Sequence, residues 1–223
     1  MADLTFILKS SIGNKIIMGL TGLFLIVFLM VHCFVNSMIF MNDGGVLFNE
    51  AAEFMGNNVL IRTMEIGLFA GLFIHIFQGL NLMIKNRKAR TIGYSVQNGN
   101  VSSKWYSRSM GLLGTLLLVF LIIHLRHFWY VSRLTNEITG HSSTMFDEMK
   151  EVFANLWVVI VYVLGMISLS YHLMHGFQSS FQTMGWNHNK YTPAIKMIGF
   201  WFSVIVPLIF ASMPIALHLG LIK

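Results

Sequence analysis

Four histidines stand inside long apolar stretches of the sequence, and they are the side chains best suited to chemistry. His32, His75, His124 and His172 each fall in a different apolar stretch. Ionisable residues are costly and rare inside membrane segments, so each is a candidate functional residue, although one such histidine alone also fits a hydrogen-bonded packing role. The only cysteine is Cys33. One thiol excludes an internal disulfide, a cysteine-based zinc site, an iron–sulfur cluster and a c-type haem attachment, so any metal or redox centre must use histidine.

The stretches that carry these histidines are long enough to cross a bilayer. Of the 223 residues, 55% are hydrophobic and 11% are charged, and the mean hydropathy is +0.67. A chain of this size cannot bury so much apolar surface in its own core, and its composition excludes a disordered, disulfide-rich or nucleic-acid-binding protein. About 20 apolar residues cross the hydrocarbon layer. We therefore predict one all-α membrane domain over residues 1–223, with five spans at roughly 15–40, 59–84, 109–133, 152–182 and 197–221.

The ends of the spans carry the expected signals. Turn-forming residues stand at 42–45, 56–58 and 98–100. The first span lacks the short apolar region and small-residue cleavage site of a secretory signal, so we expect it to remain in the mature protein.

Charge predicts the orientation of the chain. The N-terminus and the loops after the second and fourth spans carry ten basic residues and one acid, Asp3, a net charge of +9. The opposite side carries five basic residues and eight acids, a net charge of −3. Basic residues accumulate in cytoplasmic loops, which predicts a cytoplasmic N-terminus and an external C-terminus. The ten basic residues are Lys9, Lys15, Lys85, Arg87, Lys88, Arg90, Lys104, Arg108, Lys190 and Lys196.

With this orientation the four histidines fall at two depths. Counting along each span places His32 and His124 in the outer half of the membrane, and His75 and His172 in the inner half. At 1.5 Å per residue the two layers are roughly 10–15 Å apart. Two histidine pairs on facing helices are what two stacked, six-coordinate haems require, because each iron takes one imidazole from each side. A zinc or copper site would need three or four ligands converging at one point.

Glycine spacing adds a second sign at the inner layer. Gly79 follows His75 and Gly176 follows His172, both at i+4 on the same helical face. A glycine at this position leaves room for a porphyrin plane, although small residues at this spacing are also common in ordinary membrane-helix contacts. His175 shares a face with His172, and we choose His172 as the ligand because of its glycine. His175 is then expected beside the ligand or on the propionate side.

The outer layer offers a similar choice, and cations near both layers suit haem propionates. His127 shares a face with His124, and His124 is the predicted ligand because it is deeper. Propionates are anionic and favour basic side chains and hydrogen-bond donors. Arg108 and Ser109 lie at the inner mouth of the bundle and are predicted to serve the inner haem. Arg126 is deep in the third span, where it either pairs with an outer propionate or extends outward to the interface.

With these residues in place, the chain resembles a known family. The segment SSIGNK at 10–15, followed by GLTGL at 19–23 and His32, is similar to the first helix of the cytochrome b membrane anchor of succinate dehydrogenases and fumarate reductases. The resemblance is to the single-subunit, five-helix, two-haem kind. The run SRSM at 107–110 before Gly114 and His124 resembles its third helix, and YHLMHG at 171–176, ending near Gln182 and 185–186, resembles its fourth.

The resemblance implies a function and a set of partners. It implies two b haems with the same ligand pairs, and a flavoprotein subunit and an iron–sulfur subunit that dock on the cytoplasmic side of the inner membrane. The chain would pass electrons between the iron–sulfur subunit and menaquinone, or in the reverse direction during fumarate reduction, without succinate chemistry of its own. Whole complexes of this type often pair.

The quinone site departs from the family's pattern. A well-studied fumarate reductase has an acid near its outer quinone site, where this chain has Met55, with Glu50, Glu53 and Glu65 nearby. Among these we choose Glu65, at the start of the second span, as the quinone-side proton acceptor. An ordinary interfacial acid explains it equally well.

Other functions remain open at this stage. The five-helix dihaem anchors of nitrate reductases, formate dehydrogenases and hydrogenases also place four histidines in two layers, although here the first four spans contribute evenly. A proton-relaying transporter without haem would favour acids in the middle of the spans, and here Asp and Glu stand only near span ends. A purely structural anchor leaves the pairing by depth unexplained.

Overall fold

The computed structural model describes residues 10–88, 104–135 and 143–222. In this part of the chain it is helical, and five helices are long and apolar enough to cross a membrane: Ile12–Met41, Val59–Lys88, Met110–Leu134, Leu156–Thr183 and Thr192–His218. The prediction of five spans is confirmed, which indicates a multi-pass membrane protein. The basic residues Lys9 and Arg90 and the turn at 98–100 lie outside the described residues.

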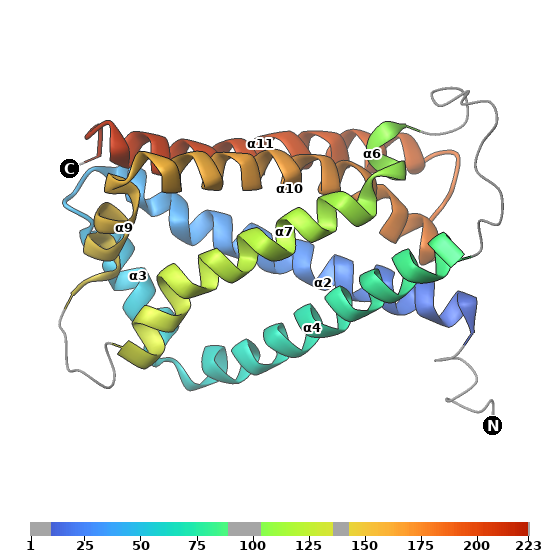
Figure 1. The fold of residues 1–223 in the computed structure, drawn as a ribbon, viewed down its shortest axis with the longest axis horizontal. Coiled ribbons are helices and arrows are strands. Elements are labelled where there is room, and N and C mark those ends of the chain that lie inside the picture. The colour runs from blue at the N-terminus through green and yellow to red at the C-terminus, as the bar shows by residue number, and fades with distance from the viewer. Residues whose placement is uncertain (1–9, 89–103, 136–142, 223) are drawn as a thin grey trace.

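The spans form an elongated bundle in which α2 begins at one end and α11 finishes at the other (Figure 1). Helix α10 (Leu156–Thr183) is central, because it packs against α11 (Thr192–His218), α7 (Met110–His124) and α2 (Ser11–Ser37). Helix α4 (Val59–Lys88) packs chiefly against α2. The structure describes every residue of α4, and none of them is buried. The bundle therefore has a tight side around α10 and a loose side at α4.

Two short helices at one end of the bundle were not predicted. Helix α3 (Val46–Asn57) joins the first two spans, and α9 (Met145–Ala154) precedes the fourth (Figure 1). Phe48 of α3 and Phe146, Met149 and Phe153 of α9 are buried in the main apolar cluster of the described residues, together with Ile39, Val159, Tyr162, Met213 and Ile222. The i, i+3, i+7 spacing of the α9 residues is typical of one buried helical face and was the available signal.

An asparagine sets the start of the fourth span. The sequence predicted a start at 152, but α9 ends at Ala154 and α10 begins at Leu156. Asn155 between them has extended backbone, and its side chain accepts a hydrogen bond from Trp157 N at 2.9 Å. An asparagine cap satisfies a backbone donor that the helix leaves free, which favours a new helix at this point. The fourth span thus begins later than predicted, whereas the fifth begins at Thr192, earlier than the predicted 197.

The turn predicted at 42–45 is present and explains how α3 begins. Asn42, Gly44 and Gly45 all have positive φ, which is the conformation favoured by asparagine and glycine. The Asp43 carboxylate accepts from the backbone N–H of Gly45 and of Leu47, both at 3.0 Å. A Cβ on Gly45 would lie 2.3 Å from the Phe146 ring, so this glycine also allows α3 and α9 to meet.

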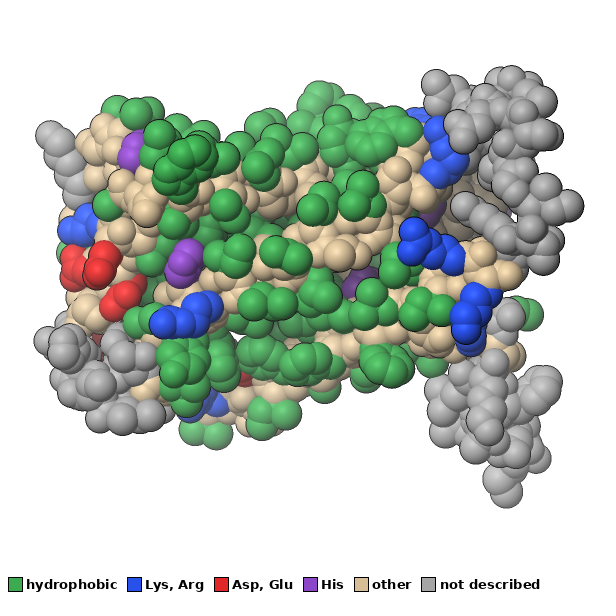
Figure 2. Space-filling model, in the orientation of Figure 1, with side chains coloured by type: hydrophobic (Ala, Val, Ile, Leu, Met, Phe, Trp, Pro, Cys, Tyr) green, Lys and Arg blue, Asp and Glu red, His purple; other side chains and the backbone are tan. Residues whose placement is uncertain are grey.

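Charged side chains gather at the two ends. The acidic side chains visible in Figure 2 lie toward the end formed by α3 and α9, which we call the α9 end. At the opposite end, called the α6 end after α6 (Trp105–Arg108), basic residues stand in the last turn of α4 and just before α7. The described basic residues there include Lys15, Lys85, Arg87, Lys88, Lys104 and Arg108.

Candidate functional site

Two histidines from helices far apart in the sequence meet toward the α6 end. His75 of α4 and His172 of α10 have ring centroids 6.3 Å apart at an interplanar angle of 67°. His175 lies one helical turn beyond His172 and is half-buried. The ring that approaches His75 is thus His172, the residue chosen from the sequence. We keep the name inner pair for His75 and His172.

A second pair lies nearer the α9 end. His32 of α2 and His124 of α7 have ring centroids 5.9 Å apart at an interplanar angle of 88°. Phe28 and Phe210 flank His32, and Phe120 and Phe128 flank His124, with centroid distances of 5.2 to 5.8 Å. This outer pair is therefore enclosed by aromatic rings from α2, α7, α11 and the turn after α7.

The separation between the pairs can be counted along two helices. Thr21 of α2 touches His75, and His32 stands eleven residues later on the same helix. At 1.5 Å per residue these positions are about 16 Å apart. On α7, the space beside Gly114 borders His172, and His124 stands ten residues later, or about 15 Å. Both helices therefore place the two histidine pairs about 15–16 Å apart, which is at or slightly above the predicted separation of roughly 10–15 Å.

In each pair, one ring is held by its neighbours and the other is not. The Nδ1 atom of His75 lies 3.1 Å from the Thr21 hydroxyl, and that of His32 lies 3.3 Å from the Asn36 amide nitrogen. The Nδ1 atoms of His124 and His172 are buried without a hydrogen-bond partner in the described part of the chain. Leaving a buried polar atom unsatisfied costs about 1–3 kcal/mol. Each pair therefore contains one imidazole whose Nδ1 atom has no hydrogen-bond partner among the described residues.

The ring spacing fits a metal bound between two imidazoles. An imidazole nitrogen lies about 2.0–2.1 Å from the metal it binds, and the ring centroid lies about 1.1 Å behind it, so two opposed rings have centroids roughly 6.3 Å apart. The observed 5.9 and 6.3 Å are near this value. Direct aromatic packing covers the same range. A metal bound at Nδ1 of His124 or His172 would give that atom the partner that packing alone does not.

The donor set favours haem over an ion held by protein ligands alone. Within the described ranges, no three His, Cys, Asp or Glu side chains group closely enough to hold a metal ion. Cys33 is buried and free. Two imidazoles are too few for a zinc site but are the axial pair of a six-coordinate haem, in which the porphyrin supplies the other ligands.

The two predicted glycines differ in their surroundings. A Cβ on Gly176 would meet nothing within 4 Å, which leaves the space beside His172 open to a planar group. A Cβ on Gly79 would lie 3.2 Å from the end of Met18, so this glycine borders the contact between α2 and α4. Gly22 and Gly114 entered the sequence analysis only through the family resemblance and not as site residues, yet a Cβ on Gly22 would lie 3.6 Å from His75 Cε1 and one on Gly114 3.8 Å from His172 Cε1.

Helix α7 changes its winding directly after His124. Residues Leu125–Trp129 and Val131–Thr135 form π-helical turns, which are often found at functional sites. There the His127 ring stacks on Tyr162 at 5.9 Å, and its Nδ1 lies 3.1 Å from the Tyr162 hydroxyl. Tyr162 also contacts His124, with centroids 6.1 Å apart. It is a buried neighbour of the outer pair that the sequence analysis did not select.

The predicted cationic residues lie on different surfaces. Arg126 is exposed and its guanidinium lies over the Tyr130 ring at 4.8 Å. Arg108 ends α6, and Ser109 caps the start of α7 without a side-chain hydrogen bond. Helix α6 packs on α10 through Trp105 and Tyr171, whose rings are 4.6 Å apart. Because Tyr171 precedes His172, this contact places the Arg108 segment beside the α10 turn that carries His172 of the inner pair.

Glu65 is the centre of a polar cluster near the α9 end. Its carboxylate accepts a hydrogen bond from Trp129 Nε1, and it pairs with Arg133 at 3.5 Å and Arg62 at 3.8 Å. Arg133 also donates to the Gly56 carbonyl at 3.5 Å. The cluster thus joins the end of α3, the start of α4 and the π-helical part of the third span.

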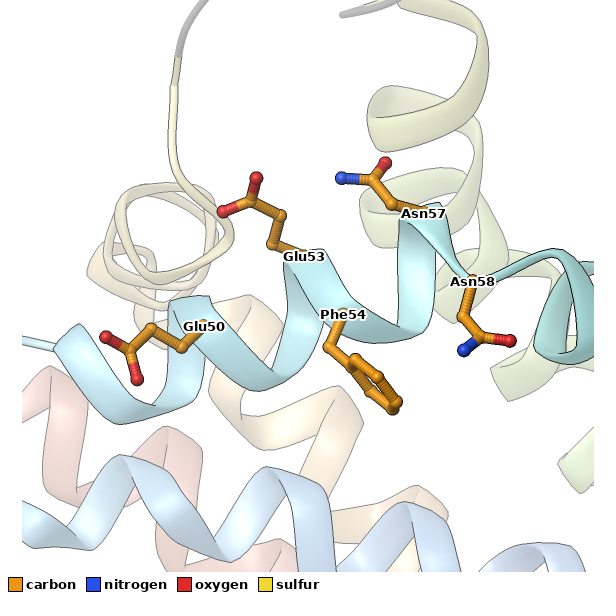
Figure 3. A pocket seen from close by; sticks show the side chains of 5 residues that line it. All are labelled: Glu50, Glu53, Phe54, Asn57 and Asn58. Atoms are coloured by element: carbon orange, nitrogen blue, oxygen red, sulfur yellow. The ribbon is translucent and has the colours of Figure 1, made fainter.

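An open hollow of about 440 Å³ lies next to α3. It is lined by Glu50, Glu53, Phe54, Asn57 and Asn58. Figure 3 shows that these side chains radiate from α3, with Glu53 and Phe54 on opposite sides of the helix. Binding sites have polar groups that converge on a ligand. This hollow lacks that feature.

The chain was compared with protein-family models, curated proteins and solved structures, and none of them matches it. The assignment of a function therefore depends on the residues and geometry of this chain.

Proposed function

We propose that the chain is the dihaem cytochrome b membrane anchor of a succinate:quinone oxidoreductase, that is, a succinate dehydrogenase or fumarate reductase. In this role it carries electrons between an iron–sulfur subunit and menaquinone and performs no succinate chemistry itself. It lies in the inner membrane with a cytoplasmic N-terminus and an external C-terminus. The proposal names His75 with His172 and His32 with His124 as axial ligands of two b haems.

The observation that carries the proposal is the pairing of four histidines from four helices at two depths. The pairs are about 15–16 Å apart along both α2 and α7. A packing role explains one buried histidine, but it does not explain two facing pairs at regular depth, each with an unsatisfied ring nitrogen. The even use of α2, α4, α7 and α10 also favours this anchor over those of nitrate reductases, formate dehydrogenases and hydrogenases.

The chain's own residues bind and orient the group. When bound, haem iron supplies one-electron transfer, with a potential set by its ligands and surroundings. Neutral imidazole is the form that binds iron. A porphyrin held by His75 would bury the inward face of α4, where no residue is otherwise buried. Gly176 leaves space for it beside α10.

The two ends of the bundle have different proposed partners. The basic α6 end faces the flavoprotein and iron–sulfur subunits, close to the inner pair. Menaquinone is placed near the outer pair, toward the α9 end. Glu65, the acid selected from the sequence as the quinone-side proton acceptor, is bonded to Trp129 and Arg133 toward this end.

A haem count on the purified full chain tests the proposal. We expect two low-spin b haems per chain in a pyridine haemochrome assay and a reduced-minus-oxidised spectrum. A variant with leucine at all four histidines is the matched control and should contain none. One haem per chain would mean that one pair is misassigned. A haem-free chain would overturn the proposal and return the histidines to a transporter or packing role.

A further inference from the structure

The Thr21 hydroxyl has one hydrogen, and two backbone carbonyls lie within hydrogen-bond distance of it. Thr21 Oγ1 donates to the backbone of its own helix, where the Ile17 carbonyl lies at 2.8 Å and the Met18 carbonyl at 3.2 Å. A hydroxyl has a single donor and two lone pairs. Toward His75 Nδ1, at 3.1 Å, Thr21 therefore acts as an acceptor.

This arrangement fixes the tautomer of His75. Because Thr21 accepts, Nδ1 of His75 carries the hydrogen, and Nε2 keeps its lone pair. A neutral imidazole binds a metal through such a lone pair, and an acceptor on the other nitrogen orients the ring and raises its basicity. Gly22 borders the same ring, since a Cβ there would make ordinary contact with His75 Cε1 at 3.6 Å, and its tight contact would be with Ser180 Oγ at 3.1 Å.

From these contacts we infer that Thr21 is a positioning residue for the inner haem: its hydroxyl holds the His75 ring in the ligating tautomer and lowers the reduction potential of the bound iron. The inference rests on the proposed function. A more basic imidazole stabilises the ferric state, so removing the acceptor raises the midpoint potential. His172 has no equivalent partner on Nδ1 among the described residues, so Thr21 is the contact that distinguishes the two ligands of this pair.

Potentiometric titration of purified Thr21→Val tests the inference. Valine keeps the branched shape and removes the acceptor. We expect the ferric/ferrous equilibrium of the inner haem to change about three- to tenfold in favour of the ferrous state. For one electron this raises the inner midpoint potential by about 28–59 mV, while the outer potential stays unchanged. Selective loss of the inner haem is the other supporting result. His172→Ala identifies which potential is the inner one.

Matched variants separate a specific effect from a structural one. Thr115 makes the same i−4 bond, to the Gly111 carbonyl at 2.8 Å, on an exposed face of α7. Thr115→Val should leave both potentials unchanged, and Thr21→Ser should restore the inner potential. Thr21→Cys, with a weaker acceptor, should shift it less than valine, and it serves as the decisive variant if Thr21→Val does not fold.

Each outcome has one meaning. Two haems in the wild-type chain with an unchanged inner potential in Thr21→Val, or in Thr21→Cys where valine does not fold, would overturn the inference and leave the proposed function intact. An equal shift in Thr115→Val would overturn it too. A haem-free wild-type chain would overturn the proposed function itself.

Discussion

The inner and outer histidine pairs both consist of two histidines at similar ring spacing. They differ in the hydrogen bond that one ring of each pair makes with a neighbouring side chain. At the inner pair, a hydroxyl accepts from His75 and leaves Nε2 free. At the outer pair, the Asn36 amide nitrogen donates to the His32 carbonyl at 2.8 Å and lies 3.3 Å from His32 Nδ1. An amide nitrogen only donates, so Nδ1 of His32 is an acceptor here and Nε2 carries the hydrogen.

This difference shows that a histidine can be in the right place and still have the wrong ring nitrogen free to bind iron. His75 can bind iron through Nε2 as it stands, whereas His32 needs the Asn36 amide to turn its oxygen toward Nδ1 first. We therefore expect the inner site to fill before the outer one when haem is limiting. Two histidines with the same proposed role can thus differ because of one neighbouring side chain.

The largest expected effect comes from removing a ligand in either pair. His172→Ala should abolish the inner haem and His124→Ala the outer one, because each leaves one axial position empty. His175→Ala and His127→Ala are the matched controls and should keep both haems. The haem count and the two α-band components provide the measurement. A chain that keeps both haems in His172→Ala and loses one in His175→Ala would reverse the assignment on α10.

A steric change should also distinguish the two pairs. A Cβ on Gly165 would lie 2.5 Å from the Phe120 ring, which stacks on His124, whereas a Cβ on Gly114 would make ordinary contact with His172. We expect Gly165→Ala to destabilise the chain by about 1–3 kcal/mol and to perturb the outer haem. Gly114→Ala should behave like the wild type. Thermal unfolding in detergent, followed through haem absorbance, measures both. Equal behaviour of the two variants would contradict this packing difference.

Asn36→Leu sharpens the comparison of the hydrogen bonds. We expect it to shift the outer midpoint potential by less than Thr21→Val shifts the inner one, because the Asn36 contact with the ring is longer and the amide is held mainly by the His32 carbonyl. Redox titration of the two variants side by side measures the difference. A larger shift at the outer site would show that Asn36, once turned, is the stronger acceptor.

The smallest expected effect is at the start of α9, near the outer pair. The Thr144 hydroxyl, at 2.7 Å, and then Lys150, at 3.1 Å, hold the pKa of Asp147 below its usual value. A lowered pKa stabilises the folded state above the unfolded pKa of about 3.9, and this is lost as the pH falls through the folded value.

Hydrogen exchange of the α9 amides should therefore become faster as the pH drops below about 4, after correction for intrinsic exchange. Asp147→Asn should be insensitive to pH in this range, and the amides around the inner pair should not respond. An identical acid response in Asp147→Asn would assign the effect to another group.

Parts of this molecule could be predicted from residue types and spacing. Continuous apolar stretches predict the five spans, because backbone groups in lipid must be satisfied within each helix. Depth along those spans places the four histidines in two layers. The helices at the α9 end were harder to predict. Helices α3 and α9 are too short to be recognised as membrane spans, and they are stabilised by burying Phe48 and Phe146 against other elements.

The contacts that prepare each ring were beyond prediction for a different reason. Thr21 and His75 are 54 residues apart, and His127 and Tyr162 are 35 apart. Helical periodicity gives the face of each residue on its own helix, but it does not give the rotation and crossing of two helices. The π-helical turns after His124 change that face again.

The sequence by itself determined that this is an all-helical membrane chain with five spans and histidines at two depths, since hydropathy and position along a helix are local properties. Only the tertiary structure decided that His75 meets His172 rather than His175, that Thr21 lies against His75, and that Tyr162 lies beside the outer pair. These contacts depend on how α2, α4, α7 and α10 rotate and pack, and that packing is set by the whole set of side chains between them.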